Sequence, residues 1–258
     1  MHIELLAVSA IAPSTGAAGI AVGDNSLTVK NGRGAKMISM RSVHQVGGFV
    51  QVSYPSAHDT TRGYRVDAAI GANPALLPMG QMLTLQAQEL LSFNIAGSAV
   101  AGDVEQIFCT MHYDDLPGIN QRLITPAQLD SQMEELTTIQ LPIVSTAGPS
   151  FGTAVAINSN TDLLRANRNY AVLGMISRTL LGAAFLIGPD TSNLRVGVPG
   201  IPNRPELTGQ WFKILSNISG KPCIPVINSG NKASTFFGVA TDENAGTFNV
   251  SWLLALLK

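Results

Sequence analysis

Hydrophobic and polar residues alternate over many short stretches of this chain. In residues 49–54, Val50, Val52 and Tyr54 fall on one face, and Gln51 and Ser53 fall on the other. A period of two residues is typical of a half-buried β-strand. Similar short strands are expected at residues 3–9, 19–22, 27–29, 107–113, 153–157, 180–187, 224–227 and 248–252. Residues 253–257 are apolar on both faces, which predicts a strand end buried between two layers.

Turn residues separate these strands. Asn31-Gly32 indicates a β-hairpin between its neighbours, because both residues tolerate a positive φ angle. Leu116-Pro117-Gly118 indicates a stop at the end of the first half of the chain.

One segment, residues 205–219, has the period of an amphipathic helix. Its apolar residues recur at intervals of three and four, Pro205 and Glu206 occupy the first turn, and Gly220 follows the end. A weaker helical pattern in the first half links Met79, Leu83, Ala87 and Leu90. We therefore expect one late helix in each half.

A second helix is expected between the halves, at residues 126–136. Thr125 and Gln128 have the spacing of a capping box, and Pro126 would occupy the first helical position. Leu129, Met133 and Leu136 then fall on one face of this linker helix.

The landmarks of the second half repeat those of the first half in the same order. Arg65-Val66 precedes Gly80-Gln81, and Arg195-Val196 precedes Gly209-Gln210. The other matched segments are residues 47–50 with 182–186 and residues 13–16 with 149–152. A repeat of about 130 residues with slightly drifting spacing predicts an internal duplication into two tandem domains.

The chain carries little charge. Charged residues make up 13% of its 258 residues, about half of the usual share. Because the centres of protein interfaces are depleted in charged residues, we interpret this deficit as surface that further copies cover. A compact β-protein with a Ser/Thr-rich exterior is the alternative.

The distribution of charge argues against nucleic acid as a partner. The formal net charge is −1, and the first 25 residues contain no Lys or Arg that could neutralise phosphates. Apolar residues 1–11 have no cationic flank and residues 253–257 are too few to span a bilayer, so a soluble chain made in the cytoplasm is expected.

Residues with catalytic or metal-binding chemistry form no recognisable site. The histidines, His2, His44, His58 and His112, are widely spaced, and only His112 has acidic neighbours, Asp114 and Asp115. Cys109 and Cys223 lie in apolar segments and are interpreted as reduced core residues. Gly220-Lys221-Pro222 lacks the glycine spacing and the hydroxyl of a phosphate-binding loop. We therefore expect no catalytic, cofactor-binding or metal-binding residues.

Gly148-Pro149-Ser150-Phe151-Gly152 matches the nucleophile elbow of hydrolases, G-x-S-x-G. That elbow requires a helix after the serine, whereas residues 153–157 favour a strand. No histidine follows Ser150 in the chain. The pattern therefore favours a turn, and we expect no esterase activity.

Two tandem all-β domains, each with many short strands and a late helix, resemble the double jelly-roll major capsid proteins of icosahedral DNA viruses, the tectivirus, corticovirus and adenovirus lineage. The resemblance is architectural and covers nearly the whole chain. It depends on the repeated blocks at residues 65–81 and 195–210 and on the helix at residues 205–219. The expected domains are residues 1–118, a linker with a short helix at 119–137, and residues 138–258.

This resemblance implies a viral structural protein located in the virion. Three copies would form a pseudo-hexagonal capsomer that contacts neighbouring capsomers and penton or minor capsid proteins, often above an internal viral membrane. Two alternatives stay open: a tandem β-sandwich binding module, such as a lectin or virion decoration protein, and a bicupin-type enzyme. A lectin would place aromatic residues on exposed loops, whereas Trp211 and Trp252 lie in the predicted helix and the last strand.

Overall fold

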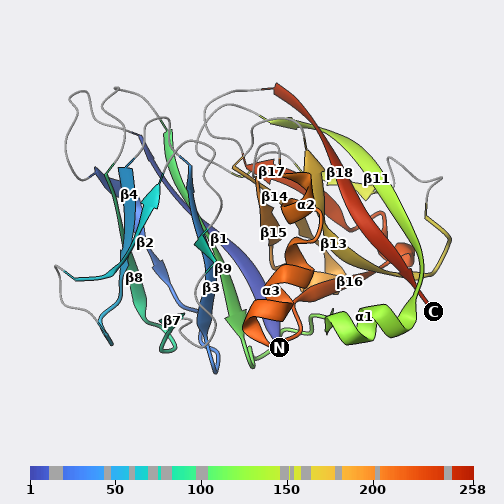
Figure 1. Ribbon diagram of the computed structural model, residues 1–258, viewed down its shortest axis with the longest axis horizontal. Helices are drawn as coiled ribbons and strands as arrows, with labels where there is room; N and C mark the ends of the chain where they lie inside the picture. Colours follow the sequence, from blue (N-terminus) through green and yellow to red (C-terminus); the bar gives the residue numbers. More distant parts are fainter. Residues whose placement is uncertain are drawn as a thin grey trace.

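The chain is an all-β protein built from antiparallel sheets, as the alternating pattern predicts. The computed structural model describes residues 1–11, 20–43, 48–57, 62–68, 75–76, 83–96, 104–145, 151, 154–157, 164–177, 182–200, 204–240 and 246–258. Four sheets stand side by side in Figure 1, with the first half of the chain on the left and the second half on the right. We call residues 1–118 the first half and residues 119–258 the second half.

The first half contributes two sheets. Sheet I has the order β1-β9-β3-β6, with β7 also paired to β3, and sheet II has the order β2-β8-β4-β5. The strands are β1 (His2–Ile11), β2 (Ile20–Thr28), β3 (Lys36–Val43), β4 (Gly48–Ser53), β5 (Tyr64–Ala68), β6 (Ala75–Leu76), β7 (Leu83–Thr84), β8 (Leu90–Ala96) and β9 (Val104–Tyr113). Met37, Cys109 and Met111 of sheet I pack against Val52 and Phe93 of sheet II in the core between them.

The second half contributes the other two sheets. Sheet III has the order β10-β16-β13-β18-β11, and sheet IV has the order β12-β17-β14-β15. The strands are β10 (Leu123–Ile124), β11 (Met133–Ser145), β12 (Val155–Ala156), β13 (Asn169–Ser177), β14 (Ala183–Ile187), β15 (Val196–Pro199), β16 (Ile224–Asn228), β17 (Phe236–Ala240) and β18 (Gly246–Leu257). Short 3-10 turns follow β14 at Pro189–Thr191 and β16 at Ser229–Asn231.

The last strand, β18, shows how the sequence pattern becomes packing. Phe248, Val250 and Trp252 are buried, while Thr247 and Asn249, which alternate with them, are exposed. Further along, Leu254 to Leu257 are all buried, because the strand there lies between two packed layers. Both the alternation and the apolar end predicted from the sequence are confirmed.

Helix α1 (Pro126–Gln132) begins where the sequence predicts. The Thr125 hydroxyl accepts a hydrogen bond from the Gln128 N–H, the Gln128 side chain accepts one from the Thr125 N–H, and Pro126 occupies the first turn. The predicted end at residue 136 is wrong. Met133 already belongs to β11, which pairs along its whole length with β18, so the sheet overrides the helical spacing of Met133 and Leu136.

The helix predicted at residues 205–219 is present as two consecutive pieces, α2 (Pro205–Thr208) and α3 (Trp211–Ser219), and Gly220 ends α3 with a φ of 64°. Trp211, Phe212 and Leu215 are buried in the core of the second half. That core also includes Ile3 and Ile38 of sheet I, so α3 packs against both halves.

Two predictions for the first half are wrong. Leu83 lies in strand β7, Ala87 in a turn and Leu90 in strand β8, so residues 83–96 form no counterpart to α3; Met79 lies outside the described residues. Asn31-Gly32 joins β2 to β3, which belong to different sheets, so it is not a hairpin. A Cβ atom at Gly32 would approach the Asp115 carbonyl oxygen to 2.7 Å, and this close approach explains the glycine.

Candidate functional site

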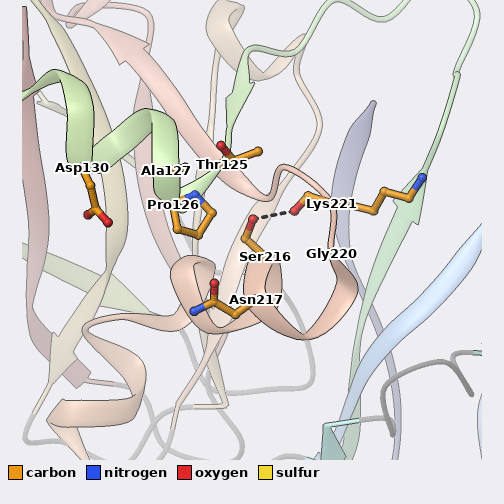
Figure 2. Close-up of a pocket in the computed structure, with 8 residues that line it drawn as sticks. All are labelled: Thr125, Pro126, Ala127, Asp130, Ser216, Asn217, Gly220 and Lys221. Carbon is orange, nitrogen blue, oxygen red and sulfur yellow. Dashed lines mark hydrogen bonds between the residues drawn. The ribbon is translucent and has the colours of Figure 1, made fainter.

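A pocket formed by described residues lies between the start of α1 and the end of α3 (Figure 2). Its volume is about 400 Å³, and it is open to solvent. Its lining residues are Thr125, Pro126, Ala127, Asp130, Ser216, Asn217, Gly220 and Lys221. These side chains include two hydroxyls, an amide, a carboxylate and an ammonium group.

The charged groups of this pocket already have partners. Asp130 accepts a hydrogen bond from Lys213 at 3.3 Å, and Lys221 forms an ion pair with Asp114 at 3.3 Å. The Ser216 hydroxyl donates to the Lys221 carbonyl oxygen, as the dashed line in Figure 2 shows, and the Lys221 ammonium group points away from Asp130. The pocket therefore places no nucleophile beside a base.

Gly220 and Lys221 also lie at the wrong helix end for a phosphate. They follow the carboxyl end of α3, where the helix dipole is negative and repels anions. This placement agrees with the sequence, which lacks the spacing of a phosphate-binding loop.

His112 lies in β9 and is only 1% exposed. Among the described residues neither of its ring nitrogens has a hydrogen-bond partner. Burial lowers the pKa of His112 to about 4; the Asp114 carboxylate opposes this shift, while Lys221, the chain's amino terminus and Lys36 add to it. At neutral pH the imidazole is therefore uncharged and enclosed.

The remaining acidic and histidine side chains that the structure describes in this region form no metal site with His112. Asp115 is bound by Arg33 at 2.8 Å, and this hydrogen bond lowers the pKa of its carboxyl. The carboxylate of Glu4, on β1, forms an ion pair with the ammonium group of Lys30 at 2.8 Å. Burial lowers the pKa of His2, and His44 and His58 lie outside the described residues. In the described part of the chain no three His, Cys, Asp or Glu side chains are placed to hold a metal ion.

Both cysteines are free and buried, as expected for core residues. Burial raises the pKa of the Cys223 thiol to about 12 and also raises that of Cys109. Since the thiolate is the reactive form, neither cysteine has the properties of a catalytic nucleophile.

Ser150 lies outside the described residues, but its surroundings are partly defined. Phe151 bridges to Ala240, and β12 at Val155–Ala156 pairs with β17, so a strand follows the serine as predicted. The Arg195 guanidinium lies 4.4 Å from the centre of the Phe151 ring, and that ring meets Phe185 edge-on at 5.0 Å. Sequence reasoning missed this cation–π contact, because its partners are distant in the chain.

A strip of uncharged exposed residues on β11 and β18 is the other feature that the sequence reasoning missed. On β11, Leu136 is 54% exposed and Val144 is 61% exposed. The remaining outward residues of this region are Thr138, Gln140 and Pro142 on β11 and Thr247, Asn249 and Ser251 on β18. We call these eight residues the β11 strip. Alternation over residues 137–144 was a usable signal, but the helical assignment to residue 136 obscured where it began.

None of the helices described in the structure has the length and apolar character needed to cross a membrane.

Comparisons with known proteins add little. The chain matches no family model and no curated protein sequence. It is similar at 9% identity to the crystal structure of the PBSX exported protein XepA, covering 98% of this chain and 86% of XepA with a TM-score of 0.26. A protein from Parabacteroides distasonis with a proposed secreted location is also 9% identical, covering 99% of this chain and 81% of that one with a TM-score of 0.25. Superpositions this distant bear on neither fold nor function.

Proposed function

We propose that this chain is a viral structural protein, a major capsid protein of the double jelly-roll class that acts without catalysis. Three copies would form a pseudo-hexagonal capsomer, and capsomers would contact one another and penton or minor capsid proteins in the shell of a virion. The proposal concerns the two halves as jelly rolls related by duplication, and it depends on a comparison of their strand orders.

The observation that carries the proposal is that one strand order occurs twice. We number the strands of each half from 1 to 8 in chain order and count β6 and β7 as one position. The first half is then arranged 1-8-3-6 in sheet I and 2-7-4-5 in sheet II. The strands β11 to β18 are arranged in the same way in sheets III and IV, with β10 added at one edge. Two four-stranded sheets in this order are the arrangement of a jelly roll.

The register of the strands supports the same relationship. In sheet I, Cys109 pairs with Leu6 on one side and Met40 on the other. In sheet III, Trp252 pairs with Ile139 and Met175 in the same places.

Irregularities in the two sheets also correspond. In β3 a bulge lies between Met37 and Ser39, and it begins three residues before Met40. In β13 a bulge lies between Val172 and Gly174, and it begins three residues before Met175. Bulges are specific features of a fold rather than defects, so their shared position favours duplication over coincidence.

The repeated Arg-Val landmarks of the sequence also occupy equivalent cross-strand pairs in sheets II and IV. Val66 of the first Arg-Val pair is opposite Val50, and Val196 of the second is opposite Leu186. The same sequence match aligns Val50 with Leu186. Gly80 and Gln81, which completed the repeat in the sequence, lie outside the described residues.

A fold by itself does not determine function, so the surface must support the same proposal. The uncharged β11 strip favours contact with other protein chains, because interface centres are depleted in charge. Trp211 and Trp252 are fully buried and supply no exposed aromatic platform for a carbohydrate. These features favour a shell-forming protein over a binding module.

Light scattering of the purified protein at micromolar concentration tests the proposal. The expected mass is three times the 27.1 kDa of the chain, and the trimer should resist dilution and moderate salt because its contacts should bury well over about 2,000 Å² per pair. Negative-stain images should show particles with a pseudo-hexagonal outline. A stable monomer would remove the capsid proposal.

A further inference from the structure

The two halves of one chain already show how one jelly-roll-like unit packs on the next. The outer face of β1 and β9 in sheet I lies against the outer face of β14 and β17 in sheet IV (Figure 1). Leu5 and Phe108 from sheet I form a buried cluster with Ala183, Phe185 and Ala240 from sheet IV.

A backbone hydrogen bond extends this contact to the sheet edges. The Leu5 N–H donates to the Arg195 carbonyl oxygen at 2.7 Å, where the chain enters β15. Gly197 of β15 lies under the Leu5 side chain, and a Cβ atom there would overlap it. The edge strand of sheet I is thus covered by the edge strand of sheet IV.

Three residues on the covered side, Leu5, Ile3 and Arg195, have counterparts on surfaces that the same chain leaves uncovered. Because Leu6 and Ile139 occupy equivalent pairs, Leu5 corresponds to Thr138 and Ile3 corresponds to Leu136. Arg195 corresponds to Arg65 at the start of β5 by the matched Val66 and Val196 pairs.

Exposure differs sharply between the counterparts. Ile3 and Leu5, which the second half covers, are 0% and 2% exposed. Leu136 is 54% exposed and Thr138 is exposed as well. On sheet II, the counterpart of sheet IV, Leu90 is 47% exposed. Each of the two uncovered surfaces, the β11 strip and the outer face of sheet II, therefore exposes at least one apolar side chain.

We infer that the β11 strip of one chain docks on the outer face of β4, β5 and β8 of a second copy, and repeats between chains the contact that sheets I and IV make within one chain. This inference rests on the proposed function, because it assigns the interface of the proposed trimer. Thr138 then donates its backbone N–H to the Arg65 carbonyl oxygen of the neighbouring copy.

The arrangement of the molecule agrees with a ring. The strip lies at one end of the row of sheets and β4 and β5 lie at the other (Figure 1). Such a head-to-tail contact joins two different surfaces, and it closes into a ring when the rotation between copies divides a full turn. Closure would also cover β11, whose outer edge has no strand partner among the described residues of its own sheet.

Disulfide trapping tests the contact directly. Adjacent strands lie about 4.8 Å apart, which is within the reach of a disulfide. The variant carrying Thr138→Cys and Arg65→Cys should therefore form covalent dimers and trimers on oxidation, since β11 and β5 belong to sheets at opposite ends of the row within one chain. Either substitution alone should leave single chains on a denaturing gel. The matched control, Leu5→Cys with Arg195→Cys, should form a disulfide within one chain.

A charge placed on the strip provides an independent readout. Val144→Asp puts a carboxylate in the proposed contact, so the dissociation constant of the trimer should rise at least about tenfold. The control Asn193→Asp adds the same charge at an exposed turn outside the strip and should leave the trimer intact. The melting temperature of the dissociated Val144→Asp chain reports whether it still folds.

The outcomes separate this inference from the proposed function. A trimer that shows no Thr138–Arg65 cross-link and tolerates Val144→Asp would overturn the assigned surface while the capsid proposal stands. A protein that stays monomeric before any substitution would overturn both.

Discussion

The ring of Phe237 packs against the indole of Trp252, with ring centroids 4.5 Å apart and planes inclined by 35°. Phe237 belongs to sheet IV and Trp252 to sheet III, so this contact joins the two sheets of the second half. Both side chains are fully buried. Their contact lies in the layer that holds the second half together.

Trp252→Ala should therefore lower the free energy of unfolding by about 3 to 5 kcal/mol, because it removes a large buried aromatic group and leaves a cavity. Thr247→Ala, on the exposed face of the same strand, should change it by less than about 0.5 kcal/mol. Chemical denaturation of both variants measures the difference. Similar midpoints would show that Trp252 lies outside the stabilising core.

Glu134, near the start of β11, lies at the surface and has an ion-pair partner. Its carboxylate accepts a hydrogen bond from Arg168 at 2.7 Å, and Arg168 also donates to the Leu257 carbonyl oxygen. Because this pair is about one-third exposed, Glu134→Ala should cost no more than about 1 kcal/mol.

The strands could be predicted well where a single strand has one solvent face. β4 and the first part of β18 alternate cleanly, because one side of each contacts the core and the other contacts water or a polar layer. The strand predicted at residues 107–113 is present as part of β9, but the prediction that it is half-buried is wrong, because Ile107 to Tyr113 are buried on both faces between sheet II and the second half. Its polar members Thr110 and His112 do not mark a solvent face.

The linker shows where local signals stop being sufficient. The capping box defined the start of α1, because it depends on four consecutive residues. The end of α1 depends on pairing between β11 and β18, whose residues Met133 and Leu257 are far apart in the chain. Periodicity within one segment cannot register such a partner, so Leu136 was assigned to the wrong element.

The candidate surface was only partly accessible from sequence. Low charge predicted that further copies cover some surface, but not which surface. The exposure of Leu136 and Val144 located the β11 strip, and the strand registers then made Leu136 equivalent to Ile3 and Thr138 equivalent to Leu5. The burial of His112 likewise depends on packing between the halves, which no single segment of the sequence records.

Gly174 illustrates a glycine required by close packing. A Cβ atom at this position would overlap the carbonyl oxygen of Thr208 at the end of α2. Gly174→Ala should therefore push α2 away from β13 and cost about 1 to 3 kcal/mol. Gly246→Ala is a matched control in another strand, since its nearest contact would be Phe248 at an ordinary 3.6 Å. Equal thermal stability of the two variants would contradict this packing.

The guanidinium of Arg195 and the ring of Phe151 should stabilise the chain together. Their separation of 4.4 Å is within the range of a cation–π contact, for which about 0.5 to 1 kcal/mol is expected at an exposed site. A double-mutant cycle with Arg195→Met and Phe151→Leu measures this coupling energy by denaturation. The Arg195 carbonyl bond to Leu5 persists in both variants, so it does not contribute. Strictly additive effects would contradict the contact.

His112 should make the stability of the fold depend on pH in mildly acidic solution. The unfolded chain binds a proton at His112 below its ordinary pKa of 6.5, whereas the folded chain does so only near a pKa of about 4. Unfolding therefore takes up a proton between these values. The free energy of unfolding should fall as the pH falls through this window, by at most about 3 kcal/mol, and should not depend on this group above pH 7.

Replacing the imidazole isolates this contribution. In His112→Asn the slope of unfolding free energy against pH should be smaller between pH 6.5 and 4, even if the variant is less stable throughout. His2, whose pKa is also lowered by burial, is present in both proteins and cancels in the comparison. The Asp114, Lys221 and Lys36 charges near His112 remain as well. Parallel pH profiles for the two proteins would show that His112 is not protonated on unfolding in this range, and that its enclosure between the halves is incomplete.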